Sequence, residues 1–119
     1  MAGAIRVGVD LVLVPRVAEL AEEGGFLARV FQPAELADTR PEHLAGLLAA
    51  KEACFKALGV PSRWQEVVVG SDPEGRPVLH LQPSLRPPGL VGLDLSIAHE
   101  GGFAVAVVVA LLEDVGGDR

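Results

Sequence analysis

Two carboxylates and a lysine are the side chains of this sequence whose types suit metal and phosphate chemistry. Glu52 and Lys56 lie four residues apart in a segment of helical pattern, so they share a helix face. Asp10 lies late in a strand-like stretch. Two carboxylates are what Mg²⁺ takes when substrate phosphates and waters complete its octahedron, and a lysine one turn along can neutralise phosphate charge. The pattern is consistent with a magnesium and phosphate site if the fold brings Asp10 to Glu52.

Each of these residues also has a structural interpretation. An aspartate near the end of a strand can hydrogen-bond its own backbone or cap the next helix. Glu52 and Lys56 can form an exposed helix pair that contributes well under ~1 kcal/mol. Two features favour chemistry. Both lysines of the chain, Lys51 and Lys56, fall in this segment, and its small residues leave the backbone approachable: Ala49, Ala50, Ala53 and Ala57.

The elements that must position these residues follow from periodicity. Apolar residues at odd numbers from Ile5 to Leu13 predict a strand with Asp10 on the opposite face. A short helix is predicted from Pro15 to the glycines at 24–25, and residues 32–35 (Gln-Pro-Ala-Glu) resemble a capping box that opens another short helix. The strongest helix is predicted over 41–58, because Pro begins it and Gly follows its end.

The second half of the chain returns to a period of two. Residues 67–69 and 78–81 are predicted strands around a turn at 72–75, and residues 93–98 and 103–112 form a second hairpin. Early helices followed by antiparallel hairpins predict a single α+β domain over residues 1–119, with an antiparallel sheet packed on a long helix. The polar tail from Glu113 to Arg119 is predicted to fray.

Composition argues against several functions. The chain has 10 Lys and Arg against 16 Asp and Glu, a net charge of −6, and only four Phe, one Trp and no Tyr. It therefore has neither the cationic surface nor the stacking platform of a nucleic-acid binder. The longest apolar run, 103–112, is too short to span a bilayer, and the start resembles no secretory signal. The single Cys54 is expected to be an inert packing residue. A cytoplasmic protein is predicted.

The three histidines have different surroundings. His43 falls in the first turn of the long helix and is expected at the surface, and His80 is expected on a sheet face. His99 ends a strand beside a Gly-Gly turn, where a loop can present a functional side chain. No pair of histidines has zinc-ligand spacing.

The chain carries a series of motifs in order: Gly8-Val9-Asp10-Leu11; Arg29-Val30-Phe31 with Glu35-Leu36; the block 49–59 around Lys51-Glu52-Ala53; and 95–100, Leu-Ser-Ile-Ala-His-Glu. Together they resemble the holo-acyl carrier protein synthases, the small single-domain branch of the 4′-phosphopantetheinyl transferases. Gly75-Arg76-Pro77 is similar to the family's Gly-basic-Pro turn. The Lys-Glu-Ala block is the most specific of these motifs.

The resemblance implies an enzyme of fatty acid biosynthesis. It would move the 4′-phosphopantetheine arm of coenzyme A onto a serine of apo-acyl carrier protein and release adenosine 3′,5′-bisphosphate. Asp10 and Glu52 would hold Mg²⁺, Lys56 would offset phosphate charge, and Glu52 or a water on the metal would accept the serine proton. The implied coenzyme A contacts are Lys56, Gly75, Arg76, Pro77, Ser96 and His99.

The resemblance also implies a homotrimer with active sites at subunit interfaces. It further implies a first helix that docks the acidic carrier: either Arg16, Arg29 and Arg40 supply the positive charge, or docking relies more on apolar contacts such as Leu20.

The sequence departs from the family pattern at several places. Leu13 and Ala98 stand where the family usually has an acidic residue and a second serine, and Gln32 replaces a capping Thr. The first helix also carries like charges that would weaken docking: Glu19, Glu22 and Glu23.

Two other functions use the same residues. A Mg²⁺-dependent nucleotide pyrophosphatase would need the two carboxylates and water but no carrier protein. A non-catalytic module that binds coenzyme A or another subunit would fit Leu13, Ala98 and the acidic first helix. The joint presence of four residues argues against the module: Asp10, Glu52, Lys56 and His99.

Overall fold

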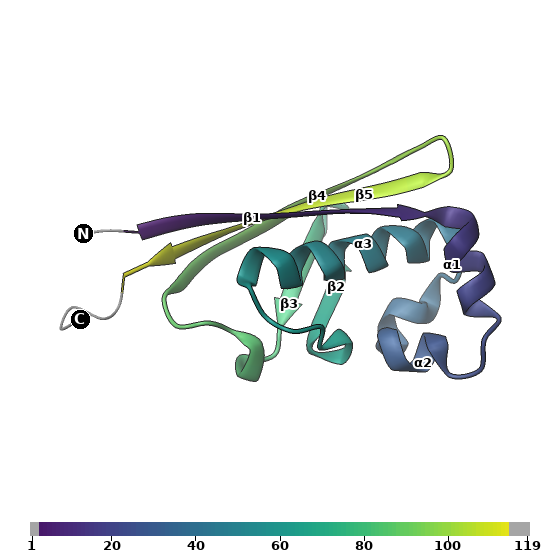
Figure 1. Ribbon diagram of the computed structural model, residues 1–119, viewed down its shortest axis with the longest axis horizontal. Coiled ribbons are helices and arrows are strands. Elements are labelled where there is room, and N and C mark those ends of the chain that lie inside the picture. Colours follow the sequence, from purple (N-terminus) through teal and green to yellow (C-terminus); the bar gives the residue numbers. More distant parts are fainter. Residues whose placement is uncertain (1–2, 115–119) are drawn as a thin grey trace.

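A long helix, α3 (Pro41–Leu58), runs beneath a three-stranded antiparallel sheet in the computed structural model (Figure 1). The structure describes residues 3–114. The sheet has the order β1 (Gly3–Leu13), β5 (Phe103–Glu113), β4 (Leu90–Glu100), so the first strand of the chain pairs with the last. The α+β class and the sheet packed on a long helix are as predicted from the sequence.

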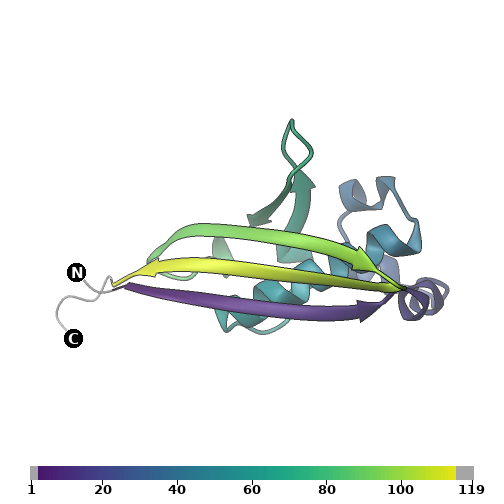
Figure 2. The same ribbon diagram turned by 90° about the horizontal axis from the view of Figure 1, so that it is seen from above.

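The remaining helical elements lie below α3 or near its ends (Figure 1), and the hairpin of residues 67–81 lies on the β4 side of the sheet (Figure 2). The predicted hairpin is β2 (Val67–Ser71) with β3 (Pro77–Leu81), and the predicted first helix is α1 (Val14–Ala21). A short helix and three 3₁₀ turns complete the chain: α2 (Phe26–Val30), η1 (Pro33–Ala37), η2 (Trp64–Glu66) and η3 (Pro83–Leu85). Of the tail predicted to fray, Glu113 ends β5 and residues 115–119 lie outside the described residues.

β1 alternates as predicted, with Asp10 opposite the apolar odd-numbered residues, but the apolar face is the exposed one. Ile5 is 68% exposed and Leu11 62%, whereas Gly8 and Val12 on the other face are buried. β5 continues the pattern, since Val107 pairs with Val9 and Val109 with Val7. Figure 2 looks onto this side, where the three strands lie in front of α3. We call its exposed apolar side chains the outer sheet face: Ile5, Val7, Val9, Leu11, Leu13, Phe103, Val107, Val109 and Leu111.

The close approach of sheet and helix explains why small residues occupy the covered face. β5 points the fully buried Ala104, Ala106 and Ala110 at the core. At Gly8 the strand lies directly on the helix, because a Cβ there would collide with the Ala53 carbonyl and the backbone nitrogen of Ala57. Asp10 follows two residues later on the same face, so this contact sets how near Asp10 lies to α3.

A buried ion pair joins α3 to the elements beneath it. Lys51 Nζ donates to Glu35 Oε1 at 2.8 Å, and also to the carbonyls of Val30 (2.8 Å) and Trp64 (2.9 Å). The other Glu35 oxygen accepts the Val69 N–H at 2.9 Å. The predicted capping interaction forms as well, since the backbone N–H of Gln32 donates to Glu35 Oε1. The pair therefore holds α2, η1, η2 and β2 against the long helix.

No helix in residues 3–114 is both long and apolar enough to cross a membrane.

Candidate active site

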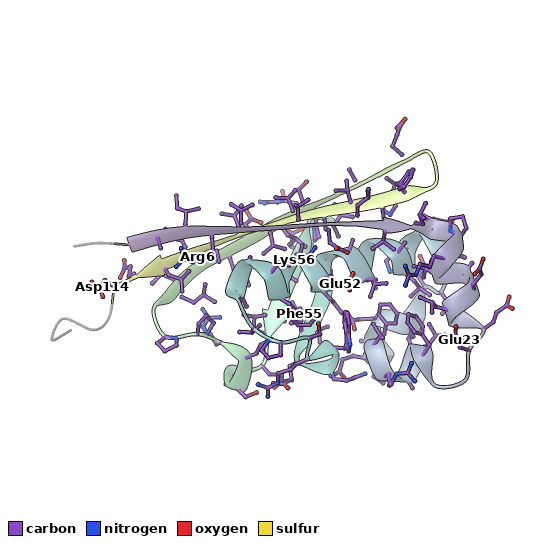
Figure 3. All side chains as sticks on the ribbon, viewed as in Figure 1. Arg6, Glu23, Glu52, Phe55, Lys56 and Asp114 are labelled. Atoms are coloured by element: carbon purple, nitrogen blue, oxygen red, sulfur yellow. The ribbon has the colours of Figure 1, made fainter. Side chains whose placement is uncertain are left out.

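The fold brings Asp10 of β1 and Glu52 of α3 to one cavity of about 370 Å³ between the sheet and the helix, which we call the carboxylate cavity. Figure 3 shows Glu52 and Lys56 on α3 where the helix passes beneath β1. Burial, together with the neighbouring Asp10 carboxyl, raises the pKa of Glu52 to about 7. Two carboxyl groups this close cannot both ionise at low cost unless a cation lies with them.

Lys56 contacts the same aspartate from the next turn of α3. Its Nζ donates to Asp10 Oδ1 at 2.9 Å and to the Val9 carbonyl at 3.1 Å. The hydrogen bond and charge of Asp10 raise the pKa of Lys56, so the ammonium form is favoured. Because the Lys56 side chain is 58% exposed while that of Asp10 is 14% exposed, the ammonium group borders solvent and a ligand can reach it.

The second oxygen of Asp10 tests whether the site suits a metal. Oδ2 is buried and has no hydrogen-bond partner in the described part of the chain. A buried oxygen without a partner is costly, and a divalent cation between Asp10 and Glu52 would satisfy it. Within residues 3–114 no third His, Cys, Asp or Glu joins the pair. The donor set therefore fits a hard cation such as Mg²⁺ that takes its other ligands from water and substrate.

A second cavity, of about 420 Å³, lies on another side of α3 and contains three of the predicted positions, Gly75, Pro77 and His99. His99 Nε2 donates to the Glu42 carbonyl at 2.8 Å, which anchors the end of β4 on the start of α3. Gly46 makes room for the ring, since a Cβ there would lie 3.0 Å from His99 Nε2. We call this space the histidine cavity.

His43 also lines the histidine cavity. Its side chain is 38% exposed, which agrees with the surface position expected from the sequence, but its place at a cavity was not predicted. One signal was available in the sequence: His43, Gly46 and Leu47 are at i, i+3 and i+4 on one helix face, and all three line the cavity.

Comparison with known proteins decides the family. The family model of the 4′-phosphopantetheinyl transferase superfamily matches residues 6–108. The chain belongs to this superfamily. A holo-[acyl-carrier-protein] synthase of Frankia alni is 40% identical over 113 residues, covering 89% of this chain and 96% of the relative. The resemblance drawn from the motifs is thereby confirmed.

Solved structures of this transferase family have the same fold. An ACPS-CoA complex of Chronobacterium ammoniagenes superposes with a TM-score of 0.81 at 36% identity, covering 93% of this chain and 99% of that one. Helicobacter pylori holo-[acyl-carrier-protein] synthase in complex with coenzyme A gives a TM-score of 0.79 at 30% identity, covering 87% and 98%. Both of those proteins were solved in complex with coenzyme A.

Three positions of this transferase that were expected to contact coenzyme A lie outside the histidine cavity: Lys56, which contacts Asp10, and Arg76 and Ser96. Arg76 Nη2 lies 3.4 Å from Asp94 Oδ2, with both side chains exposed. Ser96 is exposed and pairs with Val107, so it lies on the sheet side opposite α3. Within one chain none of these three residues meets His99 in the histidine cavity, and their contact with coenzyme A stays a prediction.

The first helix of the transferase forms another wall of the carboxylate cavity. Arg16 and Leu20, the positions expected to dock the carrier, line it together with Leu13 and Phe103. Leu13 occupies the place where the family usually has an acidic residue, so an apolar side chain lies there beside Arg16. The exposed Glu19 lies on the same helix as Arg16, and its negative charge faces any partner that approaches α1.

Cys54 is the inert packing residue that the sequence suggested. It is fully buried, and burial raises the pKa of its thiol to about 12. A thiol held in its neutral form is a poor nucleophile. The chemistry of this helix therefore rests with its oxygen and nitrogen groups.

Proposed function

We propose that this chain is a holo-acyl carrier protein synthase. It transfers the 4′-phosphopantetheine arm of coenzyme A to a serine of apo-acyl carrier protein and releases adenosine 3′,5′-bisphosphate. The observation that carries this proposal is the juxtaposition of Asp10 and Glu52 around a buried, unpartnered carboxylate oxygen. It occurs in a chain whose relatives bear that name and, in two solved cases, bind coenzyme A.

In this proposal the chain mainly aligns groups and stabilises charge, which is what phosphoryl transfer requires. The serine oxygen forms a bond to phosphorus while the P–O bond to adenosine 3′,5′-bisphosphate breaks. Asp10 and Glu52 would hold Mg²⁺, which when bound stabilises charge on the pyrophosphate. Lys56 Nζ, reachable beside Asp10, would donate to a phosphate oxygen. Glu52 or a water accepts the serine proton.

A homotrimer is part of the same proposal. The outer sheet face supports it, because contiguous apolar surface of this kind is typical of interaction sites. Ser96 lies on this side of the sheet, and Arg76 is held by Asp94 at its margin. In an assembly that buries this face, both residues would belong to an active site completed by a neighbouring subunit.

The proposed setting is fatty acid biosynthesis in the cytoplasm, with one transferase domain over residues 1–119. The carrier protein would approach α1 beside the carboxylate cavity, where Arg16 offers the positive charge and Leu20 an apolar contact. Neither nucleic acid nor membrane is a proposed partner.

An intact-mass assay tests the reaction. Apo-acyl carrier protein is incubated with this protein and coenzyme A, with Mg²⁺ or with a chelator. We expect the carrier to gain the mass of one phosphopantetheine arm only when the metal is present. Consumption of coenzyme A with an unchanged carrier would instead favour the pyrophosphatase. Coenzyme A binding without consumption, tested with several carriers, would favour the non-catalytic module.

A further inference from the structure

The Lys56 ammonium already serves as a counter-ion to the aspartate that would bind the metal. Its Nζ donates to Asp10 Oδ1 at 2.9 Å and to the Val9 carbonyl at 3.1 Å. Asp10 Oδ2 is buried and has no hydrogen-bond partner among residues 3–114. One oxygen of Asp10 is therefore held by a cation before any metal arrives, while the other stays open to a metal.

Lys56 opposes a metal by its charge rather than by its bulk. It is not among the residues that line the carboxylate cavity, so its side chain does not fill that space. Its charge nevertheless reaches both carboxylates: burial and the Asp10 carboxyl raise the pKa of Glu52, and the charge of Lys56 opposes that rise. A divalent cation at Asp10 Oδ2 would share the carboxylate with the ammonium, and two positive charges on one carboxylate repel each other. Lys56 in its observed place should therefore weaken metal binding.

Lys56 is held much less firmly than the other lysine of α3. Lys51 is fully buried and donates to three acceptors, so it has no route to a ligand. The Lys56 side chain is 58% exposed, and an ion pair with an exposed partner contributes little to stability. The ammonium can therefore leave Asp10 at small cost. A phosphate bound beside the cavity would attract it, because charge-assisted hydrogen bonds to phosphate are strong.

Coenzyme A would bring such an anion, since its pyrophosphate lies at the carboxylate cavity in the proposed function. We propose that Lys56 couples the binding of metal and coenzyme A. In the free enzyme it is the counter-ion of Asp10 and opposes Mg²⁺; when coenzyme A binds, the ammonium moves to a phosphate oxygen and leaves Asp10 to the metal. Coupling of this kind is reciprocal, so Mg²⁺ strengthens coenzyme A binding by the same factor. The coupling rests on the proposed function, whereas the opposition to Mg²⁺ in the free enzyme does not.

Calorimetry of Mg²⁺ binding to full-length variants without coenzyme A tests the opposition. The titrations are made at about pH 8.5, above the pKa of about 7 of Glu52, so that protons compete little with the metal. Lys56→Met removes the charge and should lower the Kd of Mg²⁺ about tenfold. Lys56→Arg keeps a cation and should stay within about twofold of the wild type. Arg6→Met is the matched control, because Arg6 is an exposed cation on the same face of β1 as Asp10 and lines neither cavity.

The same titrations with saturating coenzyme A and no carrier protein test the coupling. Coenzyme A should tighten Mg²⁺ binding in the wild type, and the factor of tightening should fall about tenfold in Lys56→Met. A Kd of Mg²⁺ in free Lys56→Met that equals or exceeds the wild-type value overturns the opposition. Equal factors in the two proteins overturn the coupling. Wild-type protein that binds coenzyme A but modifies no carrier would refute the transferase, while the titrations without coenzyme A would still decide whether Lys56 opposes the metal.

Discussion

The Lys51 ammonium lies 2.8 Å from the Glu35 carboxylate, and neither side chain is reached by solvent. Burial lowers the pKa of Lys51, while the charge and hydrogen bond of Glu35 oppose that shift. The pair follows the general pattern that a buried charge is tolerated only with a full set of partners. Since Lys51 precedes Glu52 on α3, the same contact fixes how the helix presents Glu52, the proposed metal ligand.

Removing one member of this pair should destabilise the protein strongly. We expect Lys51→Met to lower the free energy of unfolding by about 3–5 kcal/mol, because Glu35 would remain buried and unpaired. The double variant Lys51→Met with Glu35→Leu should recover most of the loss. Chemical denaturation measures both. If the double variant is no more stable than the single one, the loss does not come from the unpaired charge.

The carboxylate pair should make the stability of the metal-free protein depend on pH. The pKa of Glu52 is raised from 4.5 to about 7, so the folded state holds this proton more tightly than the unfolded state does. The stabilisation is complete below about pH 4.5 and is lost as the pH rises through about 7. Thermal unfolding in chelator should show this loss for the wild type and not for Glu52→Gln. Added Mg²⁺ at pH 8 should raise the Tm of the wild type alone, and identical profiles for the two proteins would contradict the account.

Replacement of Arg16 should affect the carrier more than coenzyme A. Arg16→Ala removes the positive side chain of the carboxylate cavity, and we expect the KM for the carrier to rise about two- to fivefold. The KM for coenzyme A should stay unchanged at saturating Mg²⁺. Arg86→Ala is the control, since Arg86 is exposed just after η3 and lines neither cavity. An unchanged carrier KM for Arg16→Ala would place docking elsewhere.

The outer sheet face should carry the subunit contact. Val107 lies on the central strand between Val9 and Ser96, so Val107→Asp introduces a charge into the middle of the apolar surface. Sedimentation should show trimers for the wild type and monomers for this variant. Ala28→Asp, at an exposed position of α2, should remain trimeric. A wild-type monomer at micromolar concentration would refute the assembly.

The parts of the fold with local signals could be predicted from the sequence. The helix predicted over 41–58 has the same bounds as the observed α3, because Pro41 and Gly59 are local signals for its start and its end. The five-residue α2 was missed, since it is too short to show a period. The alternation of β1 predicted a strand but could not tell which face is covered. That depends on Gly8 touching Ala53, a contact between distant segments.

Only those site residues that belong to sequence motifs could be predicted. Asp10, Glu52 and Lys56 were found from residue type, spacing and family resemblance, and the structure brings them together. Lys51, the other lysine of the motif, appeared equivalent in sequence but is turned into the core toward Glu35. The role of His43 as a cavity wall also depended on tertiary structure, because the cavity forms only when β4 and the β2–β3 hairpin meet α3.

The most direct test of the carboxylate site is the rate at which the carrier gains mass with Glu52→Gln at saturating Mg²⁺ and coenzyme A. Glutamine keeps the shape of the side chain but removes the charge that would bind the cation, so transfer should fall by at least about a hundredfold. Glu113→Gln, a matched change at the exposed end of β5, should transfer at the wild-type rate. Near wild-type transfer by a correctly folded Glu52→Gln protein would contradict the assignment of Asp10 and Glu52 as the centre of the reaction.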